Sequence, residues 1–230
     1  AHALHAVTPL EPSHVVVVIG NGRELVGAEV QRIAARTGIR IVTAVQEEQL
    51  GTGHAVVCGM AAIPEDFAGT VVITSGDVPL LDAATLTALI GAHAGAGATV
   101  LTTTLTDPTG YGRIIRDREG AVAAIVEQSD ADDEQRAIAE VNSGVYAFDA
   151  AALRSALGRL RADNAQQELY LTDAIGLLRG DGRPVRAQHV ADTALVAGVN
   201  DRVQLAALGA ELNRRIVARH PRARVTVVEP

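Results

Sequence analysis

One carboxylate of this chain stands where α/β proteins commonly place a metal ligand. Asp77 follows the uncharged, β-branched run Thr70–Thr74 after a short break at Ser75 and Gly76. Such a run is typical of a strand that is covered on both faces, in the middle of a parallel sheet. Because ligands of open α/β sheets bind beyond the carboxyl ends of the strands, Asp77 is a candidate metal ligand. An Asp that only hydrogen-bonds its own turn is an alternative interpretation that the sequence leaves open.

A second candidate group is an amide that precedes a Gly-rich loop. The segment 46–55 is predicted to join a strand to a helix, and Gly51 and Gly53 would let its backbone approach a ligand closely. Thr52 is placed to cap the helix that follows, whose N-terminus favours an anion. The carboxamide of Gln46 offers a donor and an acceptor side by side, which matches the imide face of uracil or thymine. Ordinary turn chemistry is the alternative interpretation of this loop.

Further hydrogen-bonding side chains stand at the ends of later elements. All are uncharged or acidic, which suits sugar hydroxyls, an acetamido group or Mg²⁺, and each one alone also fits a cap or a turn. They are Gly112 in a Gly-rich turn, Glu127 at the end of a strand, Asn142 before a strand, Tyr170 and Thr172 at the start of a helix, and Asn200 at the start of the last helix.

The elements that must position these residues alternate between strand and helix in the first half of the chain. Hydrophobic spacing predicts strands over 14–20, 40–45, 70–74 and 99–104, helices over 25–37 and 54–62, and a third helix that Asp82 caps and that ends near Ala94. This alternation predicts right-handed parallel crossovers.

The pattern changes after Asp107. Short strands over 113–116, 122–126 and 144–148 indicate antiparallel additions, followed by helices over 150–160 and 171–178 and strands near Val185 and Leu195. A long amphipathic helix runs from Asn200 to about Arg219. We therefore expect an α/β fold with a mixed, mostly parallel sheet and flanking helices, formed by a domain over 1–199 and a helical arm over 200–230.

The composition excludes several classes of function. The 230 residues include 20 basic and 27 acidic ones, a net charge of −7 that argues against sequence-independent binding of nucleic acid or of an anionic membrane. No apolar run approaches the ~20 residues of a membrane span, and no signal peptide is visible. The single Cys58 fits a reducing, cytoplasmic compartment and is interpreted as a core residue.

Seven segments occur in an order that resembles a known family. They are QEEQLGTGHA, SGDVPLL, PTGYGRI, IVEQSDA, VNSGVYAF, NAQQELYLTDAI and AGVNDRVQLAAL. Together they resemble the uridyltransferase half of the bacterial bifunctional N-acetylglucosamine-1-phosphate uridyltransferase/glucosamine-1-phosphate acetyltransferase, over nearly the whole chain. Single motifs such as GDVPL occur across sugar-nucleotide transferases, whereas the ordered set is much more specific.

The resemblance implies a Rossmann-like nucleotidyltransferase fold and a Mg²⁺-dependent reaction in the cytoplasm. UTP and N-acetylglucosamine-1-phosphate would give UDP-N-acetylglucosamine, a precursor of peptidoglycan and lipopolysaccharide, and pyrophosphate. It implies that Gln46, Gly51 and Thr52 hold uracil, that Ser75 and Gly76 line the nucleotide, that Asp77 and Asn200 ligate Mg²⁺, that Gly112, Glu127 and Asn142 contact the sugar, and that Tyr170 and Thr172 shape the acetamido pocket.

The sequence departs from this family in two places. The Gly-rich loop that wraps the triphosphate, and the Lys after it, have no counterpart, so we expect a fragment with little or no transfer activity. The acetyltransferase half is also absent, with 224–230 as its first stub, so acetyl transfer and the homotrimer built by that half are not expected of this chain.

Two other functions compete with this interpretation. A related nucleotidyltransferase would make a glucose or deoxy-sugar nucleotide, and the surroundings of Asn142 and of 170–172 would distinguish it. A non-catalytic sugar-nucleotide-binding module would also lack the loop. The retained pair Asp77 and Asn200 favours an enzyme.

Overall fold

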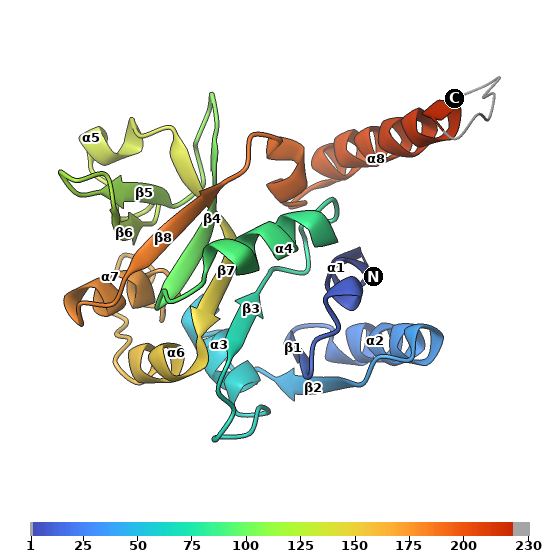
Figure 1. The fold of residues 1–230 in the computed structure, drawn as a ribbon, viewed down its shortest axis with the longest axis horizontal. Coiled ribbons are helices and arrows are strands. Elements are labelled where there is room, and N and C mark those ends of the chain that lie inside the picture. The colour runs from blue at the N-terminus through green and yellow to red at the C-terminus, as the bar shows by residue number, and fades with distance from the viewer. Residues whose placement is uncertain (1, 223–230) are drawn as a thin grey trace.

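The computed structural model describes residues 2–222 and contains two sheets with helices packed around them (Figure 1). The larger sheet has six strands. Its central strand is β7 (Glu140–Asp149), which pairs antiparallel with β3 (Thr70–Ile73), β4 (Ala98–Thr104) and β5 (Arg113–Arg116). Strand β6 (Val122–Val126) extends the sheet beyond β5, and β8 (Val185–His189) pairs with β4 in parallel. The smaller sheet is the parallel pair β1 (Val15–Ile19) and β2 (Ile41–Val45).

The predicted fold class, a mixed sheet with flanking helices, is confirmed, but parallel pairing is less extensive than expected. The prediction that Thr70–Thr74 lies in the middle of a parallel sheet is wrong. Strand β3 pairs with β7 in the antiparallel sense, and its residues are exposed or only partly buried. The strands with both faces covered are β4 and β7, most of whose residues are buried. An apolar β-branched run predicts a strand, but its partner is decided by contacts with residues far away in the chain.

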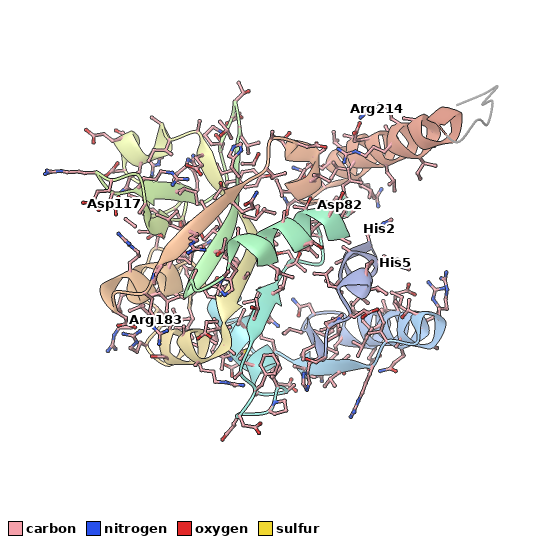
Figure 2. All side chains as sticks on the ribbon, viewed as in Figure 1. His2, His5, Asp82, Asp117, Arg183 and Arg214 are labelled. Atoms are coloured by element: carbon pink, nitrogen blue, oxygen red, sulfur yellow. The ribbon has the colours of Figure 1, made fainter. Side chains whose placement is uncertain are left out.

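The helices follow the predicted pattern, with shifted ends. Asp82 caps α4 (Ala83–Ala92) as predicted, since its side chain accepts a hydrogen bond of 2.8 Å from the Thr85 amide. Figure 2 labels Asp82 at the end of this helix. The strand predicted near Leu195 is wrong, because this segment forms the 3₁₀ helix η2 (Thr193–Val196). The helices are α1 (His2–Val7), η1 (Thr8–Leu10), α2 (Arg23–Thr37), α3 (Thr52–Met60), α4 (Ala83–Ala92), α5 (Asp133–Arg136), α6 (Ala150–Leu157), α7 (Asp173–Gly180) and α8 (Arg202–Arg222).

The core lies on both faces of the larger sheet because neighbouring residues of a strand point to opposite faces. On β7, Tyr146 and Phe148 join one cluster, which includes Leu153 of α6 and Ile175 of α7. Val145 and Ala147 join the other cluster, to which α4 contributes its Leu residues. Helix α4 crosses one face of the sheet, and α8 projects away from it (Figure 1). Among residues 2–222, no helix has the length and apolar composition needed to cross a bilayer.

Candidate active site

Asp77 and Asn200 both lie beside Gly198 although 122 residues separate them in the chain. The amide of Val199 donates a hydrogen bond of 3.0 Å to the carbonyl of Asp77, which joins the segment after β3 to the segment before α8. A Cβ atom on Gly198 would lie 3.4 Å from Oδ2 of Asp77 and 4.0 Å from Nδ2 of Asn200. Both side chains therefore lie beside Gly198, and both are exposed to solvent.

Asn200 is not needed to cap α8, although it precedes that helix. The carboxylate of Asp201 accepts a hydrogen bond of 2.7 Å from the Gln204 amide, which is the N-cap arrangement. A 180° turn of the Asn200 carboxamide would bring its oxygen to the position of Nδ2, on the side of Asp77. One carboxylate and one amide oxygen are a ligand set that fits Mg²⁺, which usually keeps several waters. The described residues contain no cluster of three or more His, Cys, Asp or Glu that would form a different metal centre.

Gly112, Glu127 and Thr172 form a second cluster, at the adjoining ends of β5, β6 and α7. A Cβ atom on Gly112 would lie 3.2 Å from Oε2 of Glu127, so glycine leaves this side of the carboxylate uncovered. The Thr172 hydroxyl donates a hydrogen bond of 3.0 Å to Oε1 of Glu127. Burial raises the pKa of Glu127, the Thr172 hydrogen bond opposes this shift, and the nearby carboxylates of Asp173 and Asp130 add to it.

Asn142 is fixed against the same cluster. Its backbone amide donates a hydrogen bond of 2.8 Å to the Gly112 carbonyl. Its side-chain Nδ2 donates to the Tyr146 hydroxyl at 2.7 Å, and its Oδ1 accepts from the Gly144 amide at 3.0 Å. A Cβ atom on Gly144 would lie 3.7 Å from Oγ of Ser75, which places this part of β7 beside the loop that leads to Asp77. Ser75 therefore connects the two clusters, because it lies beside Gly144 of β7 and two residues before Asp77.

The Gln46 loop is joined to the second cluster through the segment that precedes α7. Nε2 of Gln46 donates a hydrogen bond of 3.1 Å to the Gly51 carbonyl. The predicted cap at Thr52 is wrong, because the N-cap of α3 is Gly51 and the helix begins at Thr52. The Thr52 hydroxyl instead accepts a hydrogen bond of 3.0 Å from the Leu171 amide. The tertiary contact takes the hydroxyl that a local cap would have used.

The remaining predicted residues lie close to these clusters. The Tyr170 hydroxyl donates to Oε1 of Gln166 at 2.7 Å and lies 3.4 Å from the Ser129 hydroxyl, while its ring is buried. Tyr170 and Thr172 flank Leu171, whose amide contacts Thr52. Gly76 is exposed between Ser75 and Asp77, with open space where a Cβ atom would lie.

Three groups beside these clusters were not identified from the sequence. Gly198 lies beside both Asp77 and Asn200, the Leu169 carbonyl accepts a hydrogen bond of 2.7 Å from the Gly53 amide, and Tyr146 contacts Asn142. A glycine two residues before Asn200 was visible in the AGVND segment. The contacts of Leu169 and Tyr146 had no sequence signal, because they depend on how separate segments pack.

Comparisons with known proteins show which family the chain resembles. Residues 1–193 match the family model described as Nucleotidyl transferase. The chain is 64% identical to the "Bifunctional protein GlmU" of Mycobacterium sp. (strain KMS), over 100% of this chain and 46% of that protein. It is 62% identical to the protein of the same name from Mycolicibacterium smegmatis, over 100% of this chain and 48% of the relative.

The chain thus spans about half the length of the curated relatives that it matches. The family match covers both the β1–α2–β2 region and the larger sheet with most of the residues described above. On this match, the chain belongs to the nucleotidyl transferase family, a family of transferase enzymes.

Proposed function

We propose that this chain carries the site at which UTP and N-acetylglucosamine-1-phosphate form UDP-N-acetylglucosamine and pyrophosphate. The observation that carries the proposal is that Asp77 and Asn200 both lie beside Gly198, and that Ser75, two residues before Asp77, lies beside the strand that carries Asn142. Membership of the nucleotidyl transferase family supports the reaction class, and the seven ordered segments that resemble the uridyltransferase family support the choice of sugar nucleotide.

The reaction needs positioning and charge stabilisation more than proton transfer. A phosphate oxygen of the sugar phosphate forms a bond to the α-phosphorus of UTP, and the bond to the bridging oxygen breaks, so that pyrophosphate leaves with the electron pair. Because the nucleophile is already an anion, no side chain has to act as a general base. Asp77 and Asn200 would hold Mg²⁺, which supplies positive charge beside the phosphates when it is bound.

The sugar would lie against the cluster that contains Glu127. Oε1 of Glu127 accepts a hydrogen bond from the Thr172 hydroxyl, and Gly112 lies beside Oε2. Because glycine has no side chain, Oε2 is available to a sugar hydroxyl. Gln46, Gly51 and Thr52 are proposed to hold the uracil, and Ser75 and Gly76 to line the nucleotide. Tyr170 and Thr172, on either side of Leu171, are proposed to form the acetamido pocket.

Calorimetric titration with nucleotide sugars tests the proposal. In the presence of Mg²⁺, the chain is expected to bind UDP-N-acetylglucosamine more tightly than UDP-glucose, and both more tightly than the corresponding GDP-sugar. Asp77→Asn keeps the size of the side chain but removes its charge, so the variant is expected to lose the enhancement of binding by Mg²⁺. Asp66→Asn, in an exposed loop before β3, is the matched control and should keep it. Tighter binding of UDP-glucose, or no binding of either UDP-sugar, would refute the assignment.

A further inference from the structure

Asn142 and Tyr146 make a contact that a regular strand does not permit. They are four residues apart on β7, and four residues of extended chain span about 13 Å. Yet Nδ2 of Asn142 donates a hydrogen bond of 2.7 Å to the Tyr146 hydroxyl. The chain between them must therefore leave the regular strand path.

A bulge at Gly144 causes this departure. The pairing of β4 with β7 shifts register there, since Val100 pairs with Tyr146 but Thr102 pairs with Asn142. Gly144 has a φ of +76°, a left-handed conformation that glycine adopts without strain. Its amide donates a hydrogen bond of 3.0 Å to Oδ1 of Asn142. The bulge thus shortens the path between Asn142 and Tyr146 and also supplies a donor to the amide oxygen.

The Asn142 carboxamide is held at both ends by these two contacts. A carboxamide has two N–H donors and two acceptor lone pairs. The Gly144 amide determines which end is the oxygen, and the Tyr146 hydroxyl holds the nitrogen end. One N–H and one lone pair of Asn142 remain for another partner beside Gly112 and Glu127.

Tyr146 is itself fixed by the core. Its side chain is 3% exposed, and its ring lies 5.6 Å from the ring of Phe148. Burial raises the pKa of the Tyr146 phenol, the Asn142 hydrogen bond opposes the shift, and the carboxylate of Glu127 adds to it. The hydroxyl therefore stays neutral at physiological pH, and a rigid ring holds its oxygen at one place.

We propose that Tyr146 is a positioning residue of the sugar site, whose hydroxyl holds the Asn142 carboxamide so that its free N–H and lone pair face the sugar. The inference rests on the proposed function, because it assigns the free groups of Asn142 to a sugar ligand. Tyr146 acts through Asn142 and does not touch the reacting phosphates. Its removal should affect recognition of the sugar and leave recognition of the nucleoside diphosphate unchanged.

A double-mutant cycle on the wild-type chain and the variants Tyr146→Phe, Asn142→Ala and the double variant tests this role. The probes are UDP-N-acetylglucosamine and UDP, each titrated with Mg²⁺. Because Tyr146→Phe removes one hydrogen bond to the Asn142 carboxamide, it should raise the Kd of UDP-N-acetylglucosamine about fivefold to tenfold and leave the Kd of UDP unchanged. In the Asn142→Ala background, the same change should weaken binding less than about twofold, because its target is gone.

The inference is overturned if Tyr146→Phe leaves the affinity for UDP-N-acetylglucosamine unchanged, or if its effect is equally large without Asn142. A purely structural role of Tyr146 would instead weaken both probes together, and this result would also overturn it. Tyr146→Phe keeps the ring, and a dispersed amide spectrum verifies that each variant is folded.

Side-chain amide resonances separate this inference from the proposed function. In a ¹⁵N-labelled chain, the signal lost in Asn142→Ala identifies the Asn142 carboxamide, and Tyr146→Phe should shift its proton resonance upfield. An unshifted resonance overturns the positioning role whether or not a ligand binds. If the resonance shifts but the wild-type chain binds no UDP-sugar, the proposed function fails, and the assignment of Asn142 to a sugar fails with it.

Discussion

Replacing Gly51 by alanine should destabilise the protein more than the same change at Gly120, Gly144 or Gly176. Gly51 has a φ of +104° and a ψ of 177°, a region that is nearly restricted to glycine and costs other residues about 1–3 kcal/mol. Its Cβ atom would also lie 2.6 Å from the Leu169 carbonyl oxygen, 2.8 Å from Cβ of Glu168 and 2.9 Å from the Leu169 nitrogen. Displacing such atoms costs about 1–3 kcal/mol more, so we expect a loss of roughly 2–6 kcal/mol in the free energy of unfolding.

The atoms that would move belong to the segment that joins the Gln46 loop to the second cluster, which contains Glu127. The Leu169 amide donates a hydrogen bond of 2.8 Å to the Leu50 carbonyl, and the Leu169 carbonyl accepts one of 2.7 Å from Gly53. Thr52 holds the Leu171 amide two residues further on. Gly51→Ala is therefore expected to weaken binding of UDP-N-acetylglucosamine in addition to destabilising the fold.

Urea unfolding of three glycine variants separates the cost of the backbone conformation from the cost of displacing neighbouring atoms. Gly120→Ala has a φ of +83° but open space around its Cβ atom, so it should lose only the backbone term, about 1–2 kcal/mol. Gly176→Ala lies in α7 with open space and should gain about 0.5–1 kcal/mol, because glycine weakens a helix. If Gly51→Ala loses no more free energy of unfolding than Gly120→Ala, the close packing of Gly51 on Leu169 is wrong.

Three further changes test other parts of the structure. In the wild-type protein, burial raises the pKa of Glu127 above 4.5, so the stability that this group contributes falls as the pH rises from 4.5 through the folded pKa. Thr172→Val removes the hydroxyl that donates a hydrogen bond to the Glu127 carboxylate. In Thr172→Val, the free energy of unfolding should fall by about 1.5–3 kcal/mol more than in the wild type, and the fall should extend to higher pH. Urea unfolding at several pH values measures this, and identical pH profiles of the variant and the wild type would contradict it. Gly144→Ala forces a φ of +76° on alanine, which should lower the free energy of unfolding by about 1–2 kcal/mol. The change should also shift the Asn142 side-chain resonance, and an unchanged resonance would contradict the bulge. Asp82→Ala removes the cap of α4 and should cost about 1 kcal/mol in thermal unfolding, whereas Asp82→Asn should cost less.

The sequence by itself determined the features that depend on contacts between residues only a few positions apart. Asp82 and the helix after it were predictable, because the capping hydrogen bond joins Asp82 to Thr85. The strand before Asp77 was predictable from its β-branched residues, and the position of Asp77 after that strand followed. The ordered motifs indicated the family, which the match over residues 1–193 confirms.

Only the tertiary structure decided which segments meet. It paired β3 with the antiparallel β7, used the Thr52 hydroxyl for Leu171 and not for a cap, and made a 3₁₀ helix where a strand was expected near Leu195. It also brought Asp77 to Asn200 and Asn142 to Tyr146. The physical reason is that strand partners, bulges and hydroxyl acceptors are selected by packing between distant segments, whose competing arrangements have the same local pattern of residues.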